Sequence, residues 1–269
     1  MKFRILIQIL MIFGAITACT KSDNSEFTDS PIVESYLKPG DHPTIKITRQ
    51  TPFSSNVNYS SDDINSLSIK ITDNNISNIL TPIGEGQYID SAITIAEGER
   101  YDISFLFNSK SVTAYTEVPN KPRQVTQSVT SITIAQMDFS SGMPTSMPEN
   151  PDPVSLTWNN PDASYYIVVI ENMEKTLTAI RDFGDNTPPG NRFRKQPTTS
   201  SGTEIQSMEF QYYGKHRLIL YHVLPDYASL YSDKQSSSQN LTNPSTSILN
   251  GYGIFTALNS DTLYLNVKK

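Results

Sequence analysis

The chain has 269 residues, with 21 Lys and Arg against 27 Asp and Glu, and a formal net charge of −6. An acidic chain without clustered basic residues argues against nucleic acid as a partner, because phosphate contacts require grouped Lys and Arg. The sequence holds a single cysteine, so no disulfide can form within the chain and a packed core alone must stabilise it.

The first residues have the pattern of a bacterial lipoprotein signal. Lys2 and Arg4 precede an apolar run over 5–18, which is too short to span a bilayer. The run ends in Ile-Thr-Ala-Cys, a lipobox, at Cys19. A cysteine standing here by chance is the alternative, and the matching flanks disfavour it. We therefore expect a signal peptide over 1–18, lipidation of Cys19 by acyl chains such as palmitate, and an outer-membrane anchor. The protein would then face the cell surface or the periplasm.

After the lipobox, residues 19–30 are polar and predict a flexible tether. From Pro31 onward apolar and polar residues alternate, as in 67–71 and 101–107, which predicts half-buried strands. Turn-forming clusters separate these runs, and Asn108-Ser109 predicts a β-hairpin. Short strands with regular turns predict an antiparallel β-sandwich over 31–119.

A proline-containing segment, 118–123, predicts a linker to a second β-rich unit over 122–269. Strands are expected at 154–158 and 165–170, the second apolar on both faces as a central strand would be. In spacing and residue type the two runs resemble the second and third strands of a fibronectin type III domain. In that fold the tryptophan, here Trp158, is a core anchor.

Further elements complete the second unit. A strand is expected over 216–224, and Pro225 can start a short helix over 225–232. Two closing strands are expected at 251–255 and 262–267. The predicted fold is therefore all-β, with two antiparallel sandwiches of immunoglobulin or fibronectin III type.

Four segments of the sequence carry a second resemblance: PIVESYL at 31–37, TPF at 51–53, EGERY at 97–101 and ILNGYGIF at 248–255. Together they are similar to a family of uncharacterised Bacteroidetes outer-membrane lipoproteins, a domain of unknown function. Members often occur beside TonB-dependent transporters, so the resemblance implies an accessory role in nutrient uptake. The family supplies no catalytic residues.

The histidines do not form a recognisable catalytic or metal-binding set. On one strand, His216 and His222 would lie about 20 Å apart, too far to share a metal. We expect His222 to be partly buried and His42 to be a turn residue. Lipidation leaves no thiol nucleophile, and no Gly-x-Ser-x-Gly elbow occurs. We therefore expect no enzymatic activity, no cofactor and no metal.

Acidic loops are the weakest positive signals. Asp62-Asp63, Asp73 and 182–186 offer oxygen ligands of the kind that calcium takes. None has the spaced carboxylates of a calcium loop, so solvated turns explain them better. A hydrolase whose two carboxylates meet in a cleft remains a further alternative.

Two features point to binding. The chain contains 14 tyrosines, several of them clustered, and an exposed tyrosine offers a sugar or a protein partner a flat face with a hydroxyl. The competing interpretation places many of these rings in the core. Arg192 and Arg194 share one side of a predicted strand, either as a grip for a carboxylate or as a charged edge. The clustered tyrosines are Tyr165, Tyr166, Tyr212, Tyr213, Tyr221, Tyr227 and Tyr231.

These observations predict a non-enzymatic surface lipoprotein that is attached to the membrane by its lipid. Its expected role is binding or accessory work beside a TonB-dependent transporter, with ligand-binding residues that the sequence leaves unknown. The alternative is an adhesive or structural surface protein, because tandem sandwiches also form stalks. Tyrosines gathered at one mouth would favour binding, whereas an evenly polar surface would favour a spacer.

Overall fold

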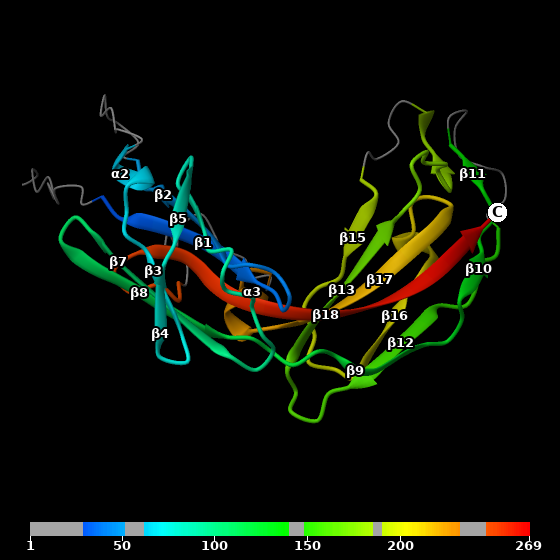
Figure 1. Cartoon of the computed structure of the whole chain (residues 1–269). Coiled ribbons are helices and arrows are strands. Elements are labelled where there is room, and N and C mark those ends of the chain that lie inside the picture. The colour runs from blue at the N-terminus through cyan, green and yellow to red at the C-terminus, as the bar shows by residue number, and fades with distance from the viewer. Residues whose placement is uncertain (1–28, 52–61, 140–147, 185–189, 232–245) are drawn as a thin grey trace, which may run out of the picture. The chain divides into compact units, whose positions relative to one another are not determined.

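A computed structural model describes residues 29–51, 62–139, 148–184, 190–231 and 246–269 (Figure 1). The expected signal peptide, Cys19 and nearly all of the expected tether lie outside these residues. Residues 30–50 and 56–269 form one compact unit. Within the described residues, no helix has the length and apolar character needed to cross a membrane.

The structure is all-β, as the alternating pattern predicts, and its strands fall into two groups around separate cores. The first group comprises β1 (Pro31–Leu37), β2 (Thr44–Arg49), β3 (Lys70–Asp73), β4 (Ile76–Ile79), β5 (Thr81–Gly84), β6 (Gln87–Ile89), β7 (Arg100–Phe107) and β8 (Lys110–Glu117), with the short helix α2 (Asp62–Asn65). The second comprises β9 (Arg123–Gln127), β10 (Ser131–Thr133), β11 (Met137–Asp138), β12 (Val154–Asn159), β13 (Tyr165–Asn172), β14 (Arg181–Asp182), β15 (Arg192–Arg194), β16 (Gly202–Ile205), β17 (Gly214–Val223) and β18 (Tyr252–Lys268), with the 3₁₀ turn η2 (Ser207–Glu209) and the helix α3 (Pro225–Ser229).

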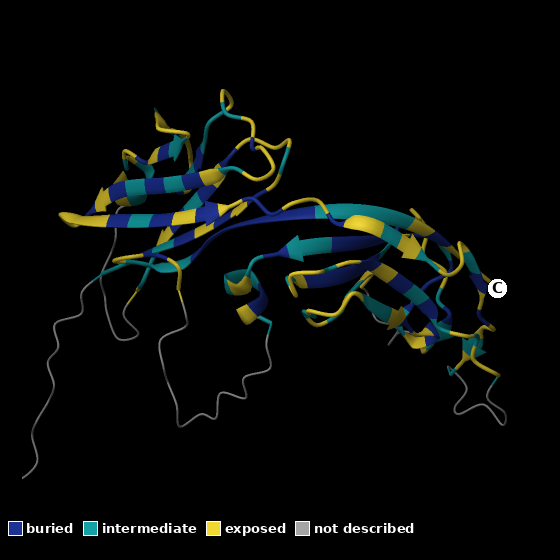
Figure 2. Ribbon diagram, turned by 90° about the horizontal axis from the view of Figure 1, so that it is seen from below, coloured by how far each residue is buried: buried dark blue, intermediate teal, exposed yellow. Residues whose placement is uncertain are grey.

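The first core lies between the sheet β4-β3-β7-β8 and the strands β1, β2 and β6. Alternate residues of β7, such as Tyr101, Ile103 and Phe105, are buried while their neighbours face outward, and Figure 2 shows this banding. The predicted hairpin joins β7 to β8. Asn108 and Ser109 have φ of 48° and 62°, the positive values that a tight two-residue β-turn requires.

The second core lies between the sheet β16-β12-β9 and the strands β13, β17 and β18. Trp158 on β12 is 4% exposed, and its ring centroid lies 5.4 Å from that of Tyr166 on β13. The prediction that this tryptophan is a core residue is confirmed. β12 and β13, the strands that resemble the second and third strands of a fibronectin type III domain, lie in different sheets across this core.

One strand, β18, belongs to both groups. The two closing strands expected from the sequence are one continuous strand of 17 residues, drawn in red in Figure 1. Its first part, 252–257, pairs in parallel with β1, and its second part, 258–267, pairs antiparallel with β17. A single sheet therefore runs in the order β15-β13-β17-β18-β1-β2-β6-β5. Residues 252–257, expected in the second sandwich, complete a sheet of the first. The boundary between two sandwich domains that the sequence places at 119–122 stays a prediction.

The segment expected as a linker is bonded to the sheet. Val118 is buried in the first core. The carbonyl of Pro119 accepts a hydrogen bond from Nδ2 of Asn259 at 3.0 Å, and that of Asn120 lies 2.8 Å from Nδ1 of His222. These bonds hold the segment against β17 and β18.

Candidate functional site

The sheet formed by β13, β17 and β18 has one face on the second core and another that α3 partly covers. Because successive strand residues point to opposite faces, Val168 and Ile170 enter the second core while Ile167 and Val169 face the other way. The latter pack with Leu258 of β18 in a third, smaller apolar cluster. β13 is thus apolar on both faces, as predicted for a central strand.

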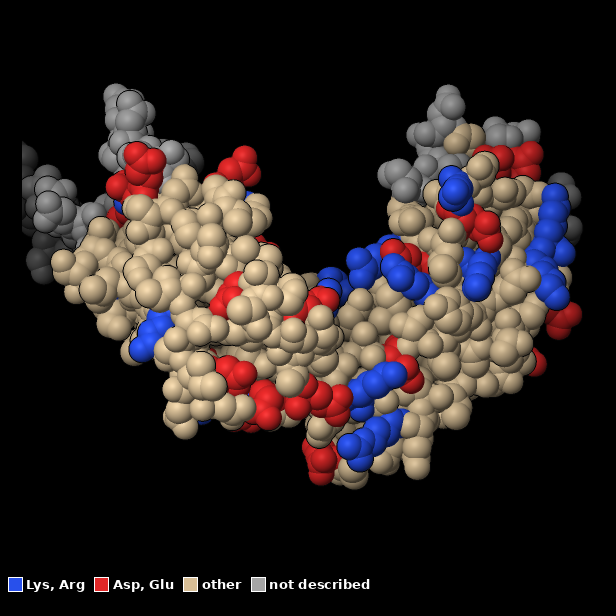
Figure 3. Space-filling view, in the orientation of Figure 1, with Lys and Arg blue, Asp and Glu red and all other residues tan. Residues whose placement is uncertain are grey.

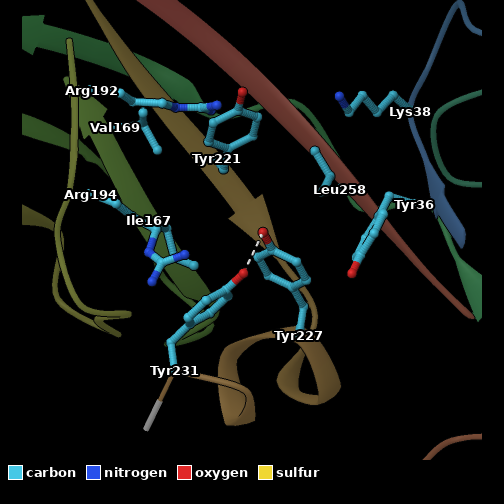
Figure 4. A pocket seen from close by; sticks show the side chains of 10 residues that line it. All are labelled: Tyr36, Lys38, Ile167, Val169, Arg192, Arg194, Tyr221, Tyr227, Tyr231 and Leu258. Carbon is cyan, nitrogen blue, oxygen red and sulfur yellow. Dashed lines mark hydrogen bonds between the residues drawn. The ribbon is translucent and has the colours of Figure 1, made fainter. Parts of the chain in front are cut away.

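A cavity of about 440 Å³ lies on this second face. Its floor is aliphatic and comes from β13 and β18. Its walls are tyrosines and cationic side chains from β15 and β17, and from β1 and α3 with the residues that follow them (Figure 4). The lining residues are Tyr36, Lys38, Ile167, Val169, Arg192, Arg194, Tyr221, Tyr227, Tyr231 and Leu258.

Three of the tyrosines contact one another in a row. The rings of Tyr36 and Tyr227 meet edge to face, with centroids 5.8 Å apart at 86°, and Tyr227 meets Tyr231 at 5.2 Å and 65°. The Tyr231 hydroxyl donates to the Tyr227 hydroxyl at 3.3 Å, the dashed line in Figure 4. Tyr227 and Tyr231 are four residues apart, the spacing that brings side chains together around a helical turn.

The helix α3 that carries Tyr227 is fixed to the sheet by polar and apolar contacts. Pro225 occupies its first turn, where the missing N–H costs nothing. The carboxylate of Asp226 accepts a hydrogen bond from Oγ1 of Thr256 on β18 at 3.0 Å and one from the Tyr227 backbone N–H at 2.7 Å. Ala228 is buried in the third cluster. The helix predicted at 225–232 is confirmed in a shorter form, because the backbone N–H of Leu230 and of Tyr231 bonds a carbonyl only three residues back.

The hydroxyls of Tyr36 and Tyr227 are neutral at physiological pH. Burial raises the pKa of Tyr227, and its contact with Tyr231 adds to the shift. Burial also raises the pKa of Tyr36, with a further contribution from the nearby Glu34 carboxylate. A neutral phenol both donates and accepts hydrogen bonds, so these groups suit a ligand that is rich in hydroxyls.

Three cationic side chains border the cavity. The guanidinium carbon of Arg194 lies 3.6 Å from the centroid of the Tyr231 ring. Arg192 and Lys38 are exposed and extend into the cavity from opposite sides in Figure 4. Lys and Arg atoms gather over β15 and β13 in Figure 3. No Asp or Glu lines the cavity within the described part of the chain.

The structure separates the clustered tyrosines into three groups. Tyr166, Tyr212 and Tyr213 are buried core residues, as the competing interpretation has it. Tyr165 is 37% exposed. The last three of the cluster, those after residue 220, line the cavity together with Arg192 and Arg194, so the two binding signals coincide.

Sequence reasoning missed Tyr36. This residue lies on β1, far from the other tyrosines along the chain, and reaches the cavity because its strand pairs with β18 at Thr256. No local pattern signals such a contact, since an alternating strand carries no mark of its distant neighbour.

The histidines are not grouped. Nδ1 of His216 lies 3.0 Å from the Gly214 carbonyl and its Nε2 lies 3.2 Å from Asn172 Nδ2, and burial lowers the pKa of His216. His222 is half-buried, as expected, and stacks on Tyr166 with centroids 4.8 Å apart. His42 sits in an exposed loop, 2.6 Å from the Ile93 carbonyl.

The acidic loops do not converge either. Asp62 and Asp63 start α2, and Asp63 pairs with Arg49 at 2.8 Å. Asp182 accepts the backbone N–H of Gly184, while 185–186 lie outside the described residues. Across the described ranges, no three His, Cys, Asp or Glu side chains come close enough to hold a metal ion.

No protein-family model matches the sequence, and no curated protein is similar enough to be identified as its relative. The class of ligand is therefore inferred from the cavity and its chemistry. That chemistry is aromatic, rich in hydroxyls and positively charged over an aliphatic floor, and it suits non-covalent recognition of a small polar molecule.

Proposed function

We propose that this protein is a non-enzymatic binding lipoprotein whose tyrosine-lined cavity takes a saccharide. The observation that carries the proposal is the convergence of four tyrosines, from three separate elements and the turn after α3, on one aliphatic floor. A sugar ring presents an apolar face bordered by hydroxyls. Tyrosine matches both parts, since its ring packs on the face and its hydroxyl bonds the rim.

The size of the cavity supports a small ligand. Small-molecule sites usually measure about 300–1,000 Å³. A cavity of about 440 Å³ lies at the lower end of that range and suits one or two sugar rings. The open rim would let a longer chain continue into solvent.

The side chains that line the cavity favour binding over catalysis. Glycoside hydrolysis requires a pair of carboxylates that flank the scissile bond. The described residues around the cavity supply phenols, guanidinium groups, an ammonium and aliphatic groups instead. We therefore keep the non-enzymatic assignment as part of the proposal.

Membrane attachment and the transport role rest on the sequence. The lipobox at Cys19 supports a lipid anchor, and the family resemblance supports work beside a TonB-dependent transporter. Purification of the tagged, full-length protein from native membranes, followed by mass spectrometry, tests the second point. A stoichiometric transporter is expected, whereas a protein that runs alone or with itself would move the adhesive or structural role ahead.

The binding site is tested by Tyr227→Ala. The full chain, purified in mild detergent, is titrated calorimetrically against a panel of neutral and acidic oligosaccharides. Loss of the central ring should weaken binding about tenfold, since an aromatic contact contributes about 0.5–1.5 kcal/mol beyond its buried area.

The matched control is Tyr115→Ala. Tyr115 is 58% exposed on β8 and, like Tyr231, lies under an arginine, but it lines no part of this cavity. Its removal should leave affinity unchanged. Absence of binding by the whole panel, or an equal loss in both variants, would contradict the proposal.

A further inference from the structure

We infer that the saccharide is acidic, with a carboxylate or sulfate group held by Arg192, Arg194 and Lys38. The inference rests on the proposed function and specifies the ligand class of the same cavity. It follows from the charged side chains that line the cavity, which are all cationic and form no ion pair with a described residue.

The carboxylates near the cavity are already engaged. Glu171, which is opposite Arg192 across the β13–β15 pair, binds Nε of Arg217 at 2.6 Å. Asp226 accepts its hydrogen bonds from Thr256 and from the α3 backbone. Glu34 interacts with the Tyr36 hydroxyl. None of these groups forms an ion pair with a cavity cation within the described residues. The Glu171 carboxylate interacts electrostatically with Arg192 across the strand pair, so the positive charge at the rim is only partly compensated by the described protein.

In a second arginine–tyrosine stack of the same chain, a carboxylate balances the charge of the arginine. On β7 and β8, the Arg100 guanidinium carbon lies 4.0 Å from the Tyr115 centroid. That guanidinium also forms two hydrogen bonds to Asp102, from Nε at 2.9 Å and from an η nitrogen at 2.8 Å. Arg194 stacks on Tyr231 in the same way, and no carboxylate among the described residues forms an ion pair with it.

The stacked geometry prepares Arg194 to bind an oxyanion. A guanidinium that lies over a ring keeps its N–H groups directed outward in its own plane, and these form paired bonds with a carboxylate or sulfate. Arg192 is two residues away on the same side of β15, because Phe193 between them packs against the second core. The two arginines therefore present donors to the same face.

Other anionic partners fit less well. Nucleic acid and anionic lipid surfaces require broad basic areas, whereas this chain is acidic overall and three cationic side chains line the cavity. Neutral tyrosine hydroxyls beside the cations favour a ligand that carries both hydroxyls and an anionic group. An acidic saccharide has this combination.

The test uses matched ligands and a matched control. The full chain in mild detergent is titrated with trigalacturonate and its methyl ester, and with 3′-sulfated lactose and lactose. The two pairs distinguish a carboxylate from a sulfate as the recognised group. The variants are R192Q/R194Q in the cavity and R100Q at the compensated stack.

We expect at least one acidic ligand to bind about tenfold more tightly than its neutral match at low salt, the size of one charge-assisted contact. The preference for the acidic ligand should shrink at high salt. It should disappear in R192Q/R194Q, which should still bind the neutral ligand. R100Q should retain the preference.

Two results would overturn the inference in different ways. Neutral ligands that bind as tightly as acidic ones, or a preference that survives in R192Q/R194Q, would refute the acidic class and leave saccharide binding standing. Absence of binding by every ligand of both pairs would refute the proposed function as well.

Discussion

The pairing of β18, the strand that both groups share, with β1 can be tested most directly at Gly253. It lies in β18 opposite Val33 of β1, with φ of +96°. A Cβ at this position would overlap the carbonyl oxygen of Val33 and lie 3.0 Å from that residue's backbone nitrogen. Gly253→Ala should therefore push β1 and β18 apart where their parallel pairing begins.

The magnitude follows from two contributions. A left-handed backbone costs an alanine about 1–2 kcal/mol, and the stiffer unfolded chain returns about 0.4–1 kcal/mol. Overlap in a packed region adds about 1–3 kcal/mol. The expected loss of unfolding free energy is about 2–4 kcal/mol, of which about 1 kcal/mol is the backbone contribution.

Gly98→Ala isolates the backbone contribution. Gly98 has φ of +79°, and a Cβ there would have no atom within 4 Å. Its backbone N–H bonds the Val118 carbonyl at 2.9 Å, a bond that alanine retains. This variant should lose about 1 kcal/mol, so the difference between the two variants measures the overlap alone.

Urea unfolding of the full chain, followed by far-UV circular dichroism and by tryptophan fluorescence, gives both quantities. The sole tryptophan, Trp158, lies in the second core, whereas Gly253 pairs within the first sheet. Because β18 supplies residues to every core, we expect Trp158 fluorescence to report the loss, with a midpoint shift of roughly 1 M urea.

Equal losses in Gly253→Ala and Gly98→Ala would refute the overlap argument. A transition seen by circular dichroism that moves while the Trp158 transition stays in place would show that the two cores unfold independently. That result would refute the prediction that β18 couples the unfolding of the two cores.

Three further predictions concern the core, the pH response and the anchor. Trp158→Ala should cost about 3–5 kcal/mol in urea unfolding, and a near-neutral value would show that the ring is not a core anchor. Burial lowers the pKa of His216, so the unfolded chain takes up a proton below about pH 6.5 that the folded chain refuses. The stability from His216 is therefore complete above that pH and declines as the pH falls towards the lowered pKa. His216→Gln should flatten this decline and the exposed His42→Gln should not; an unchanged slope in both would contradict the assignment. Cys19→Ala should release the protein from the membrane fraction, and retention there would refute the lipid anchor.

Local patterns predicted several of the longer strands. Alternation over 101–107 became β7, and Asn108 with Ser109 became its turn, because one face of a half-buried strand must be apolar and the turn must accept positive φ. Trp158 was placed in the core for the same reason, since it shares a face with Val154 and Leu156.

The continuity of β18 escaped prediction because its middle is polar. Asn259, Ser260 and Asp261 have the composition of a turn. In the structure the Asn259 amide is buried and donates to the Pro119 carbonyl and, at 3.1 Å, to the Glu97 carboxylate. These partners are distant in sequence, so only tertiary contact makes a strand of a turn-like segment.

Only some of the residues that line the cavity were predicted from the sequence. Arg192 and Arg194, with the later tyrosines, carried binding signals because tyrosine and arginine are enriched among the residues that dominate binding interfaces. Their meeting with Tyr36 depends on the parallel pairing of β1 and β18 across more than two hundred residues. Periodicity assigns a side chain to a face but does not identify the strand that lies beside it.

The parallel β1–β18 pair also determines how the protein would respond to mechanical force. With an anchor at Cys19, tension enters at the start of β1, and a load at the far end of β18 pulls that strand toward its C-terminus. The two pulls act in opposite directions along parallel strands, so the hydrogen bonds of residues 32–37 with 252–257 are loaded in shear, together rather than one after another. A chain pulled at these two points would have to break these hydrogen bonds together before β1 and β18 could separate.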